Sequence, residues 1–245
     1  MITIPSQADL TLVHAKSYIR LSPSEKGNMR KKSRVILALD EVRGERALWV
    51  AGQVADLVDA IKINWPLVLS TSPEIITELS KLAPVICDFK VADIPNTVSL
   101  IVSQAIKRGA DGVIVHGFTG SDSVKAAVQA AEGRKIFVVT EMSHPGGTEY
   151  TASAAESLAR MAVDCHASGI IAPATRPERV AALRRIVGDL LILSPGIGAQ
   201  GGSTLITLGK GADYVIVGRS IYGAEDPREA AMQVVREIKS AFPQR

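Results

Sequence analysis

The chain alternates short apolar runs with amphipathic segments, and this alternation restricts the fold more than any other feature of the sequence. Each apolar run has the length of a buried strand, and the segment after it repeats its apolar positions with helical spacing. Strands that alternate with helices in this way form a parallel sheet. The runs that we expect to be strands are 35–39, 60–63, 84–87, 112–116, 136–140, 170–172, 190–193 and 214–217.

The length of the chain selects among the ways of building such a sheet. The chain has 245 residues, close to the roughly 250 residues of a barrel with eight strands and eight helices. Its composition shows no break between Arg34 and Phe242. We therefore predict a single-domain α/β fold, the TIM (β/α)8 barrel, over residues 34–245, with an open doubly wound sheet as the alternative. Residues 1–33 are expected to be an N-terminal extension, flexible or partly helical, with no assigned role.

Composition restricts the class of protein. The formal net charge is +3, with basic and acidic residues interspersed, so we expect no nucleic-acid partner. No apolar run approaches the roughly 20 residues of a membrane span, and the N-terminus lacks the apolar segment of a secretory signal. The two cysteines, Cys87 and Cys165, fall in a predicted strand and a predicted helix, which suits buried thiols in a reducing compartment. We expect a cytoplasmic protein.

An acid and a base stand at the end of the third predicted strand. Asp88 and Lys90 follow the run 84–87, and Pro95 then opens a helix. Residues two apart on a strand point to the same side, so these two side chains should project together. A solvated surface ion pair is the ordinary alternative and contributes little. We favour a functional pair because polar residues recur at equivalent positions along the chain.

Those polar residues are expected directly after the predicted strands, where the active site of a barrel is built. They are Asp40, Lys62, Asp88, Lys90, His116, Ser143, Ser194 and Arg219.

Two glycine-rich stretches predict a phosphate site. The segment 194–202 follows the seventh predicted strand, and 218–220 follows the eighth, the two positions where barrels commonly bind phosphate. Glycines let backbone N–H groups approach a phosphate, and Arg219 can add a charge-assisted pair. We predict a phosphorylated ligand.

His116, His144 and Ser143 are not assigned to metal binding or to nucleophilic catalysis. No His, Cys or carboxylate set has familiar ligand spacing, so we assign neither His116 nor His144 to a metal. Ser143 and His144 are adjacent and are not expected to form a nucleophile and base, so Ser143 is interpreted as a hydrogen-bonding residue for substrate. Ser153 and Glu156 are expected to form a capping box for the following helix.

Taken together, these motifs resemble the orotidine 5'-phosphate decarboxylase family in its archaeal form, from about Arg34 to the C-terminus. The most specific motif is Asp88-x-Lys90-x-x-Asp93-Ile94-Pro95-x-Thr97. The supporting segments are Leu39-Asp40, Ile61-Lys62-Ile63, Val115-His116-Gly117, 140–146, 194–202 and Val217-Gly218-Arg219-Ser220.

The resemblance implies a carbon–carbon lyase that converts orotidine 5'-phosphate to uridine 5'-phosphate in de novo pyrimidine biosynthesis, without metal or cofactor. Its catalytic residues would be Lys62, Asp88, Lys90 and Asp93, a row of alternating charges in which Lys90 protonates the C6 carbanion. It also implies a homodimer in which Asp93 and Thr97 reach the partner's site.

Further binding residues are implied by the same resemblance. Asp40, Lys62 and the partner's Thr97 would hold ribose hydroxyls, and Asp88 would face the substrate carboxylate. Ser143 would contact the pyrimidine, and Gln200 would bridge base and phosphate. Gly218 and Arg219 would bind phosphate, and Pro195 and Ile197 would complete the site.

Two alternatives remain open from the sequence. One is a magnesium-dependent sister enzyme that acts on 3-keto-L-gulonate 6-phosphate or makes hexulose phosphate, which shares the Asp-x-Lys-x-x-Asp core. The other is a catalytically silent phosphate-ligand binder on the same barrel. Loss of activity with a chelator would favour the first, and tight binding of a uridine monophosphate analogue without turnover the second.

Overall fold

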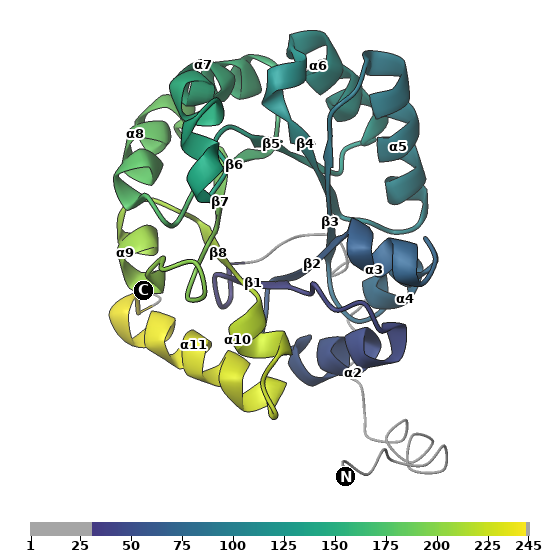
Figure 1. Cartoon of the computed structure of the whole chain (residues 1–245), viewed down its shortest axis with the longest axis vertical. Coiled ribbons are helices and arrows are strands. Elements are labelled where there is room, and N and C mark those ends of the chain that lie inside the picture. Colours follow the sequence, from purple (N-terminus) through teal and green to yellow (C-terminus); the bar gives the residue numbers. More distant parts are fainter. Residues whose placement is uncertain (1–30, 244–245) are drawn as a thin grey trace.

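A closed barrel of eight parallel strands forms the centre of the molecule, as the computed structural model shows for residues 31–243 (Figure 1). The strands pair in sequence order, and β1 closes the barrel against β8. The predicted TIM barrel is confirmed, and the open sheet is excluded. Most of the predicted N-terminal extension lies outside the described residues.

The strands agree with the predicted runs to within a few residues. They are β1 (Val35–Ala38), β2 (Ala60–Asn64), β3 (Val85–Val91), β4 (Gly112–His116), β5 (Lys135–Val139), β6 (Gly169–Ile171), β7 (Leu191–Pro195) and β8 (Tyr214–Val217).

The helices form a ring outside the barrel (Figure 1). They are α2 (Gly44–Val54), α3 (Trp65–Ser70), α4 (Ile75–Ser80), α5 (Pro95–Lys107), α6 (Ser121–Ala130), α7 (Thr151–Asp164), α8 (Pro177–Val187), α9 (Thr204–Gly209), α10 (Arg219–Tyr222) and α11 (Pro227–Ala241). Two 3-10 turns, Gly117–Thr119 and Pro145–Thr148, follow β4 and β5. No helix between residues 31 and 243 combines the length and apolar character needed to cross a membrane.

The inward-facing residues explain why polar side chains collect at one end of the barrel. A separate apolar cluster contains Ile36, Ala60, Ile86 and Ile114, which lie on neighbouring strands. Side chains on a strand alternate between faces, so the residue two positions later points inward again. In β2 and β3 that next inward residue is Lys62 and Asp88. The interior is therefore packed with apolar side chains below and charged side chains at the C-terminal end.

The structure corrects the exact placement of several polar residues. Asp88 and Lys90 lie within β3, and Ser194 lies within β7, rather than after these strands. Lys62 and His116 lie within β2 and β4, as in the predicted runs 60–63 and 112–116. Strands β3 and β7 run further than their apolar runs because a polar residue that faces the barrel mouth does not interrupt strand pairing.

The predicted capping box at Ser153 is wrong. Helix α7 begins at Thr151, whose hydroxyl donates to the Gly147 carbonyl at 2.6 Å and accepts from the Met142 amide at 3.1 Å. This contact to the preceding loop starts the helix three residues earlier than the sequence motif indicates. The last helix, α11, is capped by Asp226, whose carboxylate accepts from the Glu229 amide at 2.9 Å.

Candidate active site

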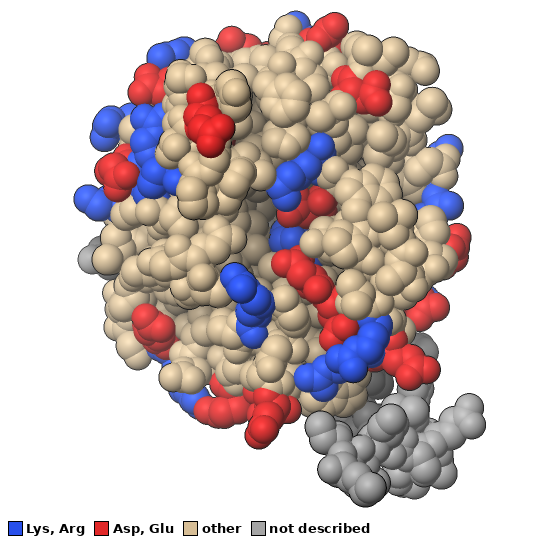
Figure 2. All heavy atoms as spheres, in the orientation of Figure 1, with Lys and Arg blue, Asp and Glu red and all other residues tan. Residues whose placement is uncertain are grey.

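A cavity of about 310 Å³ opens at the C-terminal end of the barrel. In the space-filling view, acidic and basic side chains meet inside this hollow (Figure 2). The predicted site residues that line it are Asp40, Lys62, Asp88, Lys90, Ser143, Pro195, Ile197, Gln200, Gly218 and Arg219.

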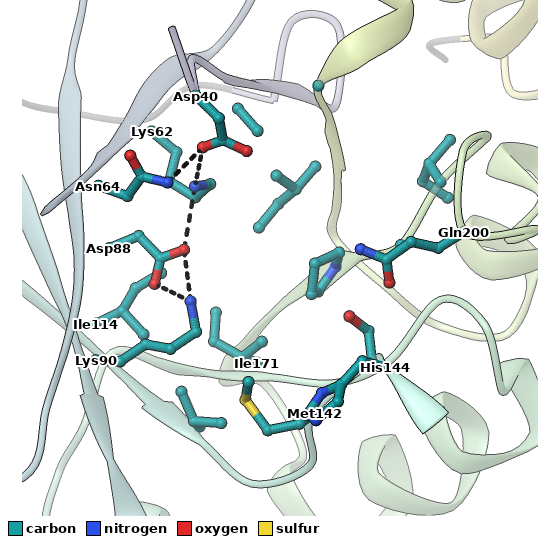
Figure 3. Close-up of a pocket in the computed structure, with 18 of the residues that line it drawn as sticks. Asp40, Lys62, Asn64, Asp88, Lys90, Ile114, Met142, His144, Ile171 and Gln200 are labelled. Carbon is teal, nitrogen blue, oxygen red and sulfur yellow. Dashed lines mark hydrogen bonds and ion pairs between the residues drawn. The ribbon is translucent and has the colours of Figure 1, made fainter. Parts of the chain in front are cut away.

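Four of these residues form a continuous row of opposite charges (Figure 3). The Lys62 Nζ lies 3.3 Å from Asp40 Oδ1 and 3.1 Å from Asp88 Oδ2. The Lys90 Nζ donates to both oxygens of Asp88, at 2.8 and 2.9 Å. Unit charges 4 Å apart interact by about 4 kcal/mol at an effective dielectric of 20, so two lysines this close need the carboxylate between them.

Neighbouring charges keep the buried members of the row ionised. Burial by itself would lower the pKa of Lys62, but Asp88 and Asp40 outweigh burial and raise it. Burial would likewise raise the pKa of Asp88, but Lys62 and Lys90 lower it. The site therefore presents fixed charges at neutral pH.

A bulge in β3 sets the direction of the Lys90 side chain. The pairing of β3 with β4 shifts register between Cys87 and Val91, and Lys90 has a φ of 44°. A left-handed conformation costs a residue with a side chain about 1–2 kcal/mol. The Phe89 carbonyl accepts from Trp65 Nε1 at 3.0 Å, and the two rings stack with centroids 4.1 Å apart. These contacts hold the bulge, so the predicted pairing of Asp88 with Lys90 is confirmed but arises from a distorted strand.

The glycine-rich loop after β7 forms the opposite wall of the cavity. Gly196 and Gly198 have φ values of 103° and 65°, which residues with side chains rarely adopt. The Gly202 amide donates to the Gly196 carbonyl at 2.9 Å and closes the loop on itself. Arg219 is exposed at the rim, where it begins α10 directly after β8. The glycine-rich loop and the Arg219 side chain thus border the same opening, a combination that suits an anionic group.

Two predicted residues do not line the cavity of their own chain. Asp93 is exposed, and its carboxylate accepts from the Ile94 amide at 2.7 Å. Thr97 lies in the first turn of α5 and is only partly buried. Ser194 is also outside the cavity, fully buried below it.

His116 lies next to the charge row without belonging to the cavity lining. Its Nδ1 is buried and lacks a hydrogen-bond partner within residues 31–243. Burial, and then the charge of Lys90, lower the pKa of His116 to about 4, so the ring is neutral at pH 7. The same part of the chain contains no group of three His, Cys, Asp or Glu residues placed to hold a metal ion.

The cavity wall also contains residues that the sequence did not assign to the site, among them Asn64, Glu141, Met142 and His144. Glu141 is fully buried, and its carboxylate accepts from Arg176 Nε at 2.8 Å and Arg179 Nε at 2.9 Å. Arg176 also donates to the Met142 carbonyl. This ion cluster fixes the segment that carries Ser143. The local sequence around Glu141 carries no signal for this cluster, because Arg176 directly precedes α8 and Arg179 lies within it, beyond α7 and β6.

The fold and the site together define an enzyme-like α/β barrel, whose cavity combines a row of alternating charges with a rim formed by a glycine-rich loop and an exposed arginine. The family model of the Orotidine 5'-phosphate decarboxylase / HUMPS family matches residues 33–234. The chain therefore belongs to this family, and the resemblance seen in its motifs is confirmed.

Individual relatives are similar over most of their length. An orotidine 5'-phosphate decarboxylase of Methanosarcina mazei is 56% identical over 215 residues, which cover 86% of this chain and 98% of the relative. That of Thermococcus kodakarensis is 49% identical over 211 residues, covering 85% and 98%. The crystal structure of the Methanocaldococcus jannaschii orotidine 5'-monophosphate decarboxylase complexed with inhibitor BMP has a TM-score of 0.79 and 46% identity, and covers 82% of this chain and 96% of that one.

Proposed function

We propose that this protein decarboxylates orotidine 5'-phosphate to uridine 5'-phosphate in de novo pyrimidine biosynthesis, as a carbon–carbon lyase that needs neither metal nor cofactor. The observation that carries the proposal is the row of Lys62, Asp88 and Lys90 inside the cavity. A row of ionised groups with one face open to a ligand can stabilise charge that develops on that ligand.

The reaction breaks the bond between C6 of the pyrimidine and its carboxylate. Carbon dioxide leaves, the electron pair stays on C6, and a proton from the Lys90 ammonium then bonds to that carbon. Asp88 faces the departing carboxylate and Lys90 faces the developing carbanion, so the site favours the transition state over the bound substrate in charge terms. The 2.8 Å contact between the two groups supports a role for both at the same small region of the ligand.

The remaining cavity residues bind the other parts of the substrate. Asp40 and Lys62 hold ribose hydroxyls, and Ser143 contacts the edge of the pyrimidine. Gln200 bridges base and phosphate, with Pro195 and Ile197 beside it. Gly218 and Arg219 bind the phosphate. Support for these roles comes from the position of all these residues on the wall of one cavity.

We also assign the protein to a homodimer in which Asp93 and Thr97 complete the partner's site. Both residues lie outside the cavity of their own chain, and the apolar side chains beside them, Ile94 and Leu100, are 65% and 59% exposed. Exposed apolar side chains next to a predicted catalytic residue suit an interface. The catalytic unit is residues 34–245, and the compartment is the cytoplasm.

The first test is the ultraviolet absorbance of orotidine 5'-phosphate mixed with purified full-length protein in the presence of a chelator. We expect conversion to uridine 5'-phosphate without added metal. Folded protein that leaves the substrate unchanged in chelator but acts on a sugar phosphate when magnesium is added would overturn the proposal in favour of the sister activity.

Subunit mixing tests the dimer. Asp93→Ala and Lys90→Ala proteins should each be nearly inactive, and a mixture should regain activity because hybrid dimers hold one intact site. The absence of any recovery, despite subunit exchange shown by differently tagged chains, would place Asp93 in its own subunit's site.

A further inference from the structure

Asn64 is the last residue of β2 and directly precedes α3, but its side chain does not cap that helix. It is the N-cap residue of α3, with φ −135° and ψ 179°. Asparagine is favoured at an N-cap because its oxygen accepts from an amide of the first turn. No such hydrogen bond forms here. The side chain is therefore held by another interaction.

That interaction is with the first residue of the charge row. Asn64 Nδ2 donates to Asp40 Oδ1 at 2.9 Å (Figure 3). The Asn64 Oδ1 is buried and has no partner among residues 31–243. Exchanging the amide oxygen and nitrogen would place an oxygen against the Asp40 carboxylate, so this orientation is the favourable one. A buried unpaired oxygen and an unused helix cap both oppose folding, which indicates a compensating role.

The geometry around Asp40 shows what that role is. Lys62 Nζ donates to the same oxygen, Oδ1, at 3.3 Å. Two donors from neighbouring positions of β2 thus hold one oxygen of Asp40, and Oδ2 has no partner within the described part of the chain. Asp40 lines the cavity and its side chain is 40% exposed. A carboxylate fixed in this way presents one free acceptor oxygen to a ligand.

We propose that Asn64 is a positioning residue that locks the Asp40 carboxylate so that its free oxygen accepts a hydrogen bond from one ribose hydroxyl of the nucleotide. Asn64 then contributes to discrimination between ribonucleotides and their deoxy forms. The inference deepens the proposed function, because it rests on a ribose beside Asp40. A hydroxyl satisfies a pre-oriented carboxylate, whereas its absence leaves that carboxylate without a partner.

Calorimetric binding of uridine 5'-phosphate, its 2'-deoxy form and its 3'-deoxy form tests this inference without requiring turnover. For the native protein we expect one deoxy ligand to bind at least tenfold more weakly than the ribonucleotide. In Asn64→Ala that ratio should shrink by about tenfold, the size of one hydrogen bond to a charged group. In an Asp40→Ala background, Asn64→Ala should change the ratio no further.

Two further variants separate positioning from a structural effect. Asn64→Ser keeps a residue that can cap α3 but is too short to reach Asp40, and should match Asn64→Ala. Asn64→Asp keeps the shape but places a second acceptor against Asp40, and should reduce the ratio as well. All three should retain a native circular dichroism spectrum, because the Asn64 side chain does not cap the helix.

An unchanged ratio in folded Asn64→Ala, or a native protein that binds all three ligands equally, would overturn the inference. Discrimination lost in Asn64→Ala, in a protein that binds uridine 5'-phosphate but does not decarboxylate orotidine 5'-phosphate, would support the inference and contradict the proposed function. A native protein that does not bind uridine 5'-phosphate would contradict both.

Discussion

Carboxylates stand at both ends of the barrel, and the two ends use them differently. At the N-terminal end, Asp59, Asp111 and Asp213 directly precede β2, β4 and β8. At the C-terminal end, Asp40 follows β1, and Asp88 lies within β3, opposite the last residue of β2. Only the second group lines the cavity.

Each aspartate at the N-terminal end accepts from backbone amides of a neighbouring strand, and Asp111 and Asp213 also form ion pairs with Arg134 and Arg184. Asp59 accepts from the amides of Lys32, Ser33 and Arg34 just before β1, at 2.9, 3.0 and 2.6 Å. Asp111 accepts from the first amide of β3, and Asp213 from the Ile192 amide in β7. Each carboxylate thus joins the starts of two adjacent strands and helps to fix their register.

Lysine side chains are the partners at the C-terminal end, and the electrostatic consequence is opposite. Burial raises the pKa of Asp59 and of Asp111 despite their hydrogen bonds. At the mouth, Lys62 and Lys90 overcome burial and lower the pKa of Asp88. The comparison teaches that a buried aspartate held by the backbone stabilises the fold, whereas one held by lysines keeps charges available to a ligand.

The largest expected effect is the loss of turnover when Lys90 is removed from the mouth of the barrel. Lys90→Ala should reduce turnover of orotidine 5'-phosphate by at least about a thousandfold, because it removes both the proton donor and one charge of the row. Its free energy of unfolding should change little, since Lys90 is 38% exposed. Absorbance kinetics and urea unfolding measure the two quantities. Near-normal turnover would show that Lys90 is not the proton donor.

The second prediction concerns the base of the barrel. Asp213→Ala should lower the free energy of unfolding by about 2–4 kcal/mol, because it removes the acceptor of the Ile192 amide and the only carboxylate that pairs with Arg184 in the described part of the chain. Turnover per folded molecule should stay within about twofold of the native value. A large loss of turnover without loss of stability would contradict the claim that aspartates at the N-terminal end serve stability and those at the C-terminal end serve the ligand.

Arg219→Ala should weaken binding rather than chemistry. Loss of a charge-assisted pair to phosphate is worth about 1.5–3 kcal/mol, or roughly 10- to 150-fold in KM. Steady-state kinetics on orotidine 5'-phosphate should show this increase, whereas orotidine without phosphate should be processed equally by both proteins. An equal loss on both substrates would mean that Arg219 does not act through the phosphate.

The smallest expected effect is on the pH dependence of stability, and it concerns His116, which lies at the mouth without a charged partner of its own among residues 31–243. His116 has a folded-state pKa of about 4, below its ordinary value of 6.5. A lowered histidine pKa contributes stability above pH 6.5 and loses it as the pH falls towards 4. Because the ring is partly solvated, we expect native protein to lose only about 1 kcal/mol more than His116→Asn between pH 7 and pH 4.5. Urea unfolding of both proteins at the two pH values measures this difference. Equal losses of unfolding free energy in the native protein and in His116→Asn would show that His116 does not titrate in this range.

The residue pattern was enough to predict the barrel and the end of it that carries the function. Strand and helix periods identify the repeating units, and the inward alternation in β2 and β3 takes the polar residues Lys62 and Asp88 to the mouth. The glycine-rich loop after β7 is recognisable in the same way, because Gly196 and Gly198 adopt φ values that residues with side chains rarely adopt. These properties are local, so the order of residues is sufficient to predict them.

The sequence did not predict the bulge at Lys90, the start of α7 at Thr151, or the partners of Glu141 and Asn64. The start of α7 depends on the contacts of Thr151 with the loop just before it. The other three depend on contacts between segments that are distant along the chain: Glu141 meets Arg176 across 35 positions, and Asn64 meets Asp40 across 24. Closure of the barrel brings such residues together, and the energy of their contact then overrides local preferences for capping and strand geometry. For that reason the sequence predicted the charges of the site, whereas the folded barrel decided how they are held.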